Sequence, residues 1–179
     1  MSVQDKVEKV QRKNRPVEPK VKELIARCKS VILGTIDAEG TPNSSYAPYV
    51  QMGNKLYILV SFMARHTKNL RDLKKVSVMF IEDESETKQI YARERLTIDA
   101  TTEQIERGTE LWDKAAAGLT EAHGKILEIL LGMEDFILIE LTPIKGSYVN
   151  GFGSAYYVDT NLEIITHRND VNHTAIKDK

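Results

Sequence analysis

The fold is decided by residues 31–60, which read VILGTI at 31–36, the turn DAEG at 37–40, SSYAPYV at 44–50 and LYILV at 56–60. Runs rich in β-branched and aromatic residues, punctuated by Gly, Asn and Pro, are typical of strands joined by tight turns. This stretch therefore predicts a three-stranded antiparallel meander. Similar runs outside it predict further strands at 76–81, 95–106, 136–141, 147–158 and 162–165.

Apolar residues recur at helical spacing in residues 17–29, 64–73 and 108–131, with a break near Gly118 or Gly124 in the last of these. Many short strands with few helices predict an α+β, mainly β architecture, an antiparallel barrel, because closing a sheet removes its exposed edges. We expect the chain to divide into a flexible arm at 1–16, a barrel domain at 17–166 with a helical insert at 107–132, and a C-terminal tail at 167–179.

Composition excludes several classes of function. The 179 residues carry 25 Lys and Arg against 26 Asp and Glu, so there is no general positive field to hold a nucleic acid. The apolar runs are far shorter than the roughly 20 residues of a membrane-spanning helix, and residues 1–20 lack the apolar segment of a secretory signal. The single cysteine, Cys28, cannot form an internal disulfide. We expect a soluble, cytoplasmic protein that binds neither nucleic acid nor membrane.

A barrel of this size is filled by its own side chains. Any ligand must then bind on the outside of the barrel, and a second subunit is a natural way to bury it. The sequence therefore predicts a homodimer.

The strongest local signal is SFMARHTKNL at residues 61–70, where a strand is expected to give way to a helix. It brings together the hydroxyl of Ser61, the cations of Arg65 and Lys68, and the imidazole of His66. Backbone N–H groups at a helix start and an arginine fork both suit an anion. The alternative is a solvated basic helix start, but cations there oppose the helix dipole, which favours the anion site.

Two histidines, His167 and His173, lie in the polar C-terminal tail, where no core explains them. Neutral imidazole is a good iron ligand, although both residues can also be read as exposed surface histidines. Asp135 precedes an apolar strand and is either a turn residue or a carboxylate that orients a ligand histidine. Metal and nucleophile motifs such as HExxH, CxxC and GxSxG are absent from the sequence.

Five blocks in order resemble the HugZ/HutZ haem-utilisation proteins of the pyridoxamine-phosphate-oxidase-like split barrels. They are residues 34–50, 64–70 (ARHTKNL), 81–84 (IEDE), 91–97 (YARERLT) and 151–156 (GFGSAY). The resemblance implies a homodimeric split β-barrel, of the FMN-binding type, that binds haem between its subunits. It also implies a haem oxygenase-like activity that opens the porphyrin ring and releases iron for iron acquisition.

In that family a tail histidine ligates the iron, and a carboxylate of the partner subunit hydrogen-bonds that histidine. Here His173 matches the ligand and Asp135 the carboxylate, with His167 as the other candidate ligand. Haem is large and apolar with two propionates, so it needs a flat apolar face and cations. The candidate cofactor-binding residues are Ser61, Arg65, His66, Lys68, Asn69 and Arg93, with an apolar lining from Tyr46, Tyr49 and Phe152.

Two other functions stay open on the same fold. In an FMN-dependent oxidoreductase, Arg65 and Lys68 would hold the flavin phosphate and Ser61 would support it. In a non-catalytic haem-storage or transfer protein, His173 and Asp135 would act as above without ring opening. For haem degradation the chain also needs an external electron donor, because no reductase module is visible in the sequence, and a haem-donor protein is a further possible partner.

Overall fold

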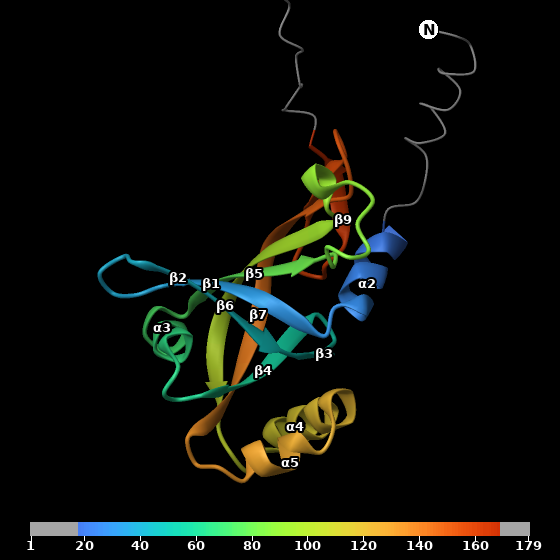
Figure 1. Cartoon of the computed structure of the whole chain (residues 1–179). Helices are drawn as coiled ribbons and strands as arrows, with labels where there is room; N and C mark the ends of the chain where they lie inside the picture. Colours follow the sequence, from blue (N-terminus) through green and yellow to red (C-terminus); the bar gives the residue numbers. More distant parts are fainter. Residues whose placement is uncertain (1–17, 169–179) are drawn as a thin grey trace, which may run out of the picture.

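The computed structural model describes residues 18–168 and shows a mainly β fold, a curled antiparallel sheet flanked by helices (Figure 1). Within this range the strands are β1 (Ser30–Ile36), β2 (Pro42–Pro48), β3 (Val50–Met52), β4 (Lys55–Ser61), β5 (Lys75–Ile81), β6 (Arg95–Ile105), β7 (Phe136–Val149), β8 (Ala155–Val158) and β9 (Ile164–His167). The helices are α2 (Glu18–Arg27), α3 (Arg65–Leu73), α4 (Glu110–His123), α5 (Ile126–Leu131) and the short 3₁₀ helix η1 (Ile90–Ala92). No helix of this part is long and apolar enough to cross a membrane.

The strand order is β2-β1-β5-β6-β7-β4-β3, with β8 beside β7 and β9 beside β8. The predicted meander is therefore wrong, because β2 and β3 lie at opposite ends of this order, and residues 31–60 form two separate hairpins. Pro48 has no N–H to continue the ladder, and Tyr49 turns into the core before β3 begins. Strands β2 and β4 nevertheless contact each other, so the sheet curls toward closure.

Strand β7 runs without interruption through 14 residues, where the sequence predicted one strand at 136–141 and another at 147–158. It pairs with β6 along almost its whole length, with β4 at its start and with β8 at its end. The backbones of β6 and β7 approach closely at Gly146, where a Cβ atom would stand 2.9 Å from the carbonyl oxygen of Thr97. Gly151 and Gly153 have φ of 147° and 67° and form the turn into β8.

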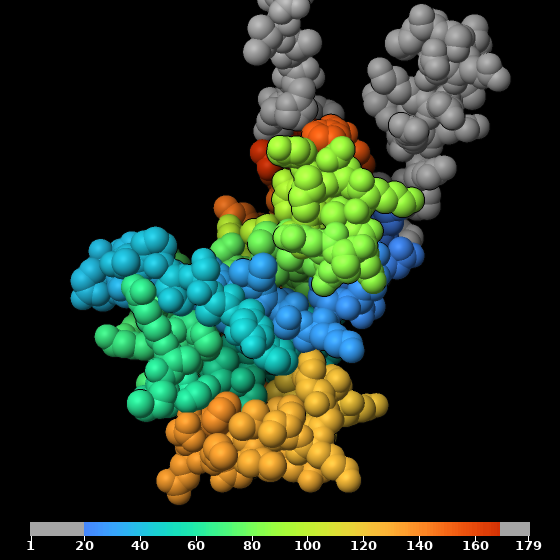
Figure 2. All heavy atoms as spheres, in the orientation of Figure 1, coloured from blue at the N-terminus to red at the C-terminus, as the bar shows by residue number. Residues whose placement is uncertain are grey.

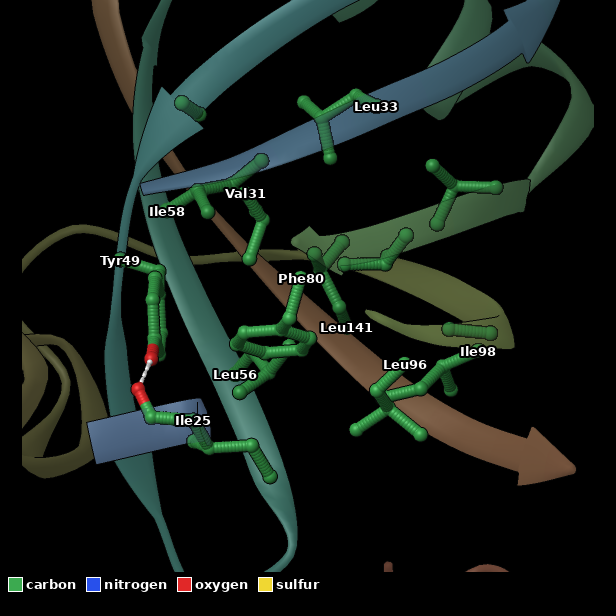
Figure 3. Packing of buried hydrophobic residues seen from close by; sticks show 14 of the residues in the cluster. Ile25, Val31, Leu33, Tyr49, Leu56, Ile58, Phe80, Leu96, Ile98 and Leu141 are labelled. Carbon is green, nitrogen blue, oxygen red and sulfur yellow. Dashed lines mark hydrogen bonds between the residues drawn. The ribbon is translucent and has the colours of Figure 1, made fainter. Parts of the chain in front are cut away.

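The main core fills the inside of the curled sheet. Side chains from β1, β4, β5, β6 and β7 converge around Phe80, as Figure 3 shows for residues such as Leu33, Ile58 and Leu96. Helix α2 adds Val21, Leu24 and Ile25 to this core. The buried hydroxyl of Tyr49 donates a hydrogen bond of 2.7 Å to the carbonyl oxygen of Ile25, which fixes α2 to the sheet.

A second core lies on the outward side of β4 and β7, under α4 and α5 (Figure 1). Trp112, Ala115 and Leu119 of α4 pack there against Tyr57 and Leu138. Helix α4 ends at His123, and Gly124 follows with φ of 83°, so the predicted break falls at Gly124. Gly118 lies within α4, close to Val50.

Candidate functional site

The junction between β4 and α3 brings together two residues that the sequence singled out separately. Ser61 ends β4 and pairs with Phe136, the first residue of β7, so Asp135 lies beside it. The Ser61 hydroxyl donates a hydrogen bond of 3.0 Å to Oδ2 of Asp135, and the backbone N–H of Phe62 donates one of 2.6 Å to the carbonyl oxygen of Asp135. A hydroxyl and a carboxylate 74 residues apart in sequence thus form one unit.

The turn from Ser61 into α3 is fixed by its own hydrogen bonds. The N–H of Met63 donates to Oγ of Ser61 at 3.2 Å, and the N–H of Ala64 donates to the carbonyl oxygen of Ser61 at 3.1 Å. The buried hydroxyl of Thr67 donates to the same carbonyl oxygen at 2.7 Å. The sequence did not predict this role for Thr67. Its position next to Arg65 and Lys68 was the only feature of the sequence that singled it out.

The cations of the junction are partly neutralised. Arg65 donates to Oδ2 of Asp37, in the turn between β1 and β2, at 2.9 Å. Hydrogen bonds from the backbone N–H of Thr41 and from Arg65 hold the pKa of Asp37 below its usual value. Burial lowers the pKa of the half-buried His66, which favours its neutral form. Lys68 is exposed and forms no ion pair with residues 18–168. It is therefore more available to an anion than Arg65, which is paired with Asp37.

Asn69, predicted to bind the cofactor, is placed inside the fold. Its side chain is buried and donates a hydrogen bond of 3.0 Å to Oγ1 of Thr35 on β1. Thr102 of β6 similarly donates to the carbonyl oxygen of Leu70. Asn69 therefore holds α3 against the sheet. Tyr49, predicted as apolar lining, is likewise buried in the core, as described above.

The remaining predicted residues gather at the other end of β7. Arg93 donates to the carbonyl oxygen of Glu82 and to the carboxylate of Glu84. Phe152, in the turn after β7, is exposed, and the Nε2 atom of His167 lies 3.0 Å from the carbonyl oxygen of Gly153. Since β7 has 14 residues at about 3.3 Å each, this group lies on the order of 40 Å along the strand from Asp135. His173 falls outside the described residues.

Between these two groups lies an outward surface that we call the open face, made of side chains from β1, β2 and β5. Tyr46 and Met79 both pair with Ile32 across the sheet, and all three point outward because Val31 and Leu33 point inward. Gly34 pairs with Ser44 and Ser77, so the next row consists of small residues: Gly34, Ser44 and Ser77. Figure 2 shows β1 and β2 (blue) at the surface, between the loop after β5 (yellow-green) and α4 with α5 (orange). Tyr46 is 69% exposed.

The curled antiparallel sheet, with its core inside and its candidate ligand residues outside, defines a split barrel. The chain belongs to the pyridoxamine 5'-phosphate oxidase family, whose model matches residues 17–150. It is 44% identical over 154 residues to the protein named Heme oxygenase HutZ from Vibrio cholerae, covering 86% of this chain and 88% of that one. The resemblance to HutZ-type proteins drawn from the sequence is thereby confirmed.

Two solved structures agree with this assignment. The structure of HutZ from Vibrio cholerae, named there as a haem storage protein, has a TM-score of 0.73 and 41% identity, covering 76% of this chain and 97% of that chain. The structure of ChuZ from Campylobacter jejuni has a TM-score of 0.81 and 30% identity, covering 90% of this chain and 66% of that chain. The predicted split-barrel fold is confirmed.

Proposed function

We propose that this protein binds haem on a site shared by two copies of the chain and opens the porphyrin ring oxidatively, releasing the iron. The observation that carries the proposal is the separation of the candidate residues into two groups at opposite ends of β7, with the open face between them. The relative named Heme oxygenase HutZ supports the same ligand and the same reaction.

The open face suits a flat, largely apolar ring. A row of Tyr46, Ile32 and Met79 borders a row of small residues, and a Cβ atom added at Gly34 would lie at an ordinary 3.5 Å from Ser77. A planar macrocycle can lie against the row of small residues, with the exposed ring of Tyr46 beside it. Lys68, in the first turns of α3, is the candidate partner for a propionate, and Arg65 can share its guanidinium between a propionate and Asp37.

Two copies are needed because one chain cannot bring both groups to one ligand. A two-fold axis places the same surface of each subunit against the other, so the start of β7 in one copy can face the end of β7 in its partner. In that arrangement Ser61 and Asp135 of one subunit meet Arg93 and Phe152 of the other. The proposed homodimer rests on the same observation as the proposed haem site.

Among the tail histidines, we assign iron ligation to His173, because His167 is already engaged by residues of the fold. The Nε2 atom of His167 is 3.0 Å from the carbonyl oxygen of Gly153, and its ring lies edge-on against Tyr156 at 4.9 Å between centroids. Ligation by Nε2 of His167 would have to break this contact. In the proposed site, Asp135 accepts the N–H of the ligating imidazole and raises its donor strength.

When bound, haem supplies the oxygen chemistry itself, and the chain supplies ligation, orientation and access. The electrons come from an external donor, and a haem-donor protein is a further expected partner. A cytoplasmic location remains a prediction from the sequence.

Two alternatives share the site. Haem storage without turnover is supported by the description given to the solved HutZ structure. Binding of FMN is supported by membership of the pyridoxamine 5'-phosphate oxidase family, with Arg65 and Lys68 at the flavin phosphate.

The test is a haemin titration of the apoprotein, followed by ascorbate and air, on wild type, His173→Ala and His167→Ala. We expect a sharp Soret band at one haem per subunit, lost in His173→Ala and retained in His167→Ala, that bleaches to a biliverdin-like product. A stable Soret band that ascorbate and air leave unchanged would establish storage. No specific haem complex, together with tight FMN binding, would replace the haem proposal with the flavin one.

A further inference from the structure

We propose that Ser61 is a positioning residue for Asp135: its hydroxyl holds one carboxylate oxygen so that the other is presented to the N–H of the iron-ligating imidazole. This inference rests on the proposed function, in which Asp135 accepts that N–H. The sequence suggested a different role for Ser61, as a direct contact to the cofactor or to a flavin phosphate.

The hydroxyl of Ser61 both accepts and donates a hydrogen bond within this junction. Because the N–H of Met63 donates to Oγ of Ser61 at 3.2 Å, that side of the oxygen already accepts a hydrogen bond. Its own hydrogen is then donated to Oδ2 of Asp135 at 3.0 Å. A hydroxyl committed in this way is not available to a phosphate, which argues against a direct contact to the cofactor.

The backbone on both sides of this hydrogen bond is fixed. Asp135 is held by the N–H of Phe62, which donates to its carbonyl oxygen at 2.6 Å. Ser61 is held by the ladder to β7 and by the buried Thr67, which donates to its carbonyl oxygen at 2.7 Å. The Ser61 to Asp135 contact is therefore set before any ligand arrives.

The second carboxylate oxygen is available. Asp135 is exposed, and among residues 18–168 its Oδ1 atom accepts no hydrogen bond. An exposed aspartate would otherwise sample several rotamers, and ordering it on binding costs conformational entropy. Fixing Oδ2 in advance reduces that cost and sets the direction of Oδ1.

This geometry predicts how loss of the hydroxyl alters the iron. A well-placed carboxylate makes the imidazole a stronger donor, which favours ferric iron and lowers the midpoint potential of the ferric/ferrous couple. In Ser61→Ala the carboxylate of Asp135 is free to change rotamer. The midpoint potential of the iron should then shift in the same direction as in Asp135→Asn. A threonine keeps the hydroxyl and fits the end of a strand, so Ser61→Thr should restore wild-type behaviour.

The experiment compares haem-loaded wild type with Ser61→Ala, Ser61→Thr and Asp135→Asn by spectroelectrochemistry and by the iron–histidine stretch in resonance Raman spectra. The matched control is Ser85→Ala, which removes a hydroxyl that also donates to an aspartate, Asp83, at 2.6 Å on the loop after β5. We expect Asp135→Asn to raise the potential and lower the stretching frequency. Ser61→Ala should shift both in the same direction by less, with Ser61→Thr and Ser85→Ala at the wild-type values.

A Ser61→Ala protein with wild-type potential and frequency overturns the inference while the haem proposal stands. Wild type that forms no specific haem complex overturns the proposed function itself, and the inference with it. If Ser61→Ala does not fold, Ser61→Cys, whose S–H is a weak donor, takes its place with the same expected direction.

Discussion

The sheet has two outward surfaces that both carry apolar side chains, but helices cover only one of them. On β4 and β7 the outward residues Tyr57, Leu59 and Leu138 are buried, because α4 and α5 lie over them. On β1, β2 and β5 the outward residues Ile32 and Tyr46 are exposed, although they are as apolar. A contiguous apolar surface left uncovered in this way marks a place for a ligand or a partner. The covered surface serves stability, and the open face is where we expect function.

The largest effect should come from the covered surface. Trp112 is 6% exposed and packs between α4 and the sheet, so Trp112→Ala should lower the free energy of unfolding by about 3–5 kcal/mol. Urea unfolding followed by circular dichroism measures this loss. A change below about 1 kcal/mol would mean that α4 contributes little to the fold and that the two surfaces differ less than their burial indicates.

A smaller effect should come from the carboxylate buried beneath the same helices. Glu140 is 5% exposed and accepts hydrogen bonds from Lys55 at 2.6 Å and from the buried Tyr57 at 2.7 Å. Since a hydrogen bond to a charged group contributes about 1.5–3 kcal/mol, Glu140→Gln should lower the free energy of unfolding by about 1–3 kcal/mol at pH 7.

The pH dependence of that loss has a definite sign. Burial by itself raises the pKa of Glu140, but hydrogen bonds from Lys55, Tyr57 and Thr142 outweigh it and bring the pKa below its usual value. A lowered folded-state pKa stabilises the fold above the unfolded pKa of about 4.3, and the stabilisation is lost as the pH falls through the folded value. The difference in unfolding free energy between wild type and Glu140→Gln should therefore shrink as the pH falls below the unfolded pKa. A gap that stays constant would contradict this assignment.

The smallest effect on stability should come from the open face. Tyr46→Ala removes an exposed ring, so the unfolding free energy of the haem-free chain should change by less than about 0.5 kcal/mol, measured at a protein concentration that favours monomers. Haemin affinity and dimer formation should weaken in the same variant, by titration and by sedimentation. Unchanged affinity and unchanged dimerisation would move the ligand site away from the open face.

Local patterns in the sequence predicted most of the helices and strands, because strand alternation and helical spacing depend on near neighbours. Helix α3 and strand β5, for example, lie where the sequence expected them. Strand pairing is nonlocal and was predicted less well. The predicted meander is wrong because residues 48 and 49 change the direction of the chain. The two strands predicted at 136–141 and 147–158 are wrong because β7 continues through Pro143, which lies in a bulged stretch opposite Ala100.

The candidate site shows the same limit. The residues of the junction at 61–70 were identified because they are contiguous, but their partners were not. Asp37 lies 28 residues before Arg65, and no spacing rule connects the two. Asn69 was predicted to bind the cofactor, whereas the fold buries it against Thr35. Each of these contacts depends on the strand order, which the sequence did not reveal.

The covering helices also bear on how the chain folds. Strands β6 and β7 form the longest pairing of the sheet, yet about 30 residues separate the end of one from the start of the other. Closing a flexible loop of that length costs about 2 kcal/mol more than closing a four-residue turn. Helices α4 and α5 occupy most of that segment, and local helical structure forms faster than distant strands pair. Once α4 and α5 have formed, fewer residues between β6 and β7 remain to be ordered. The helices that cover one surface of the sheet should therefore also speed the pairing of β6 with β7.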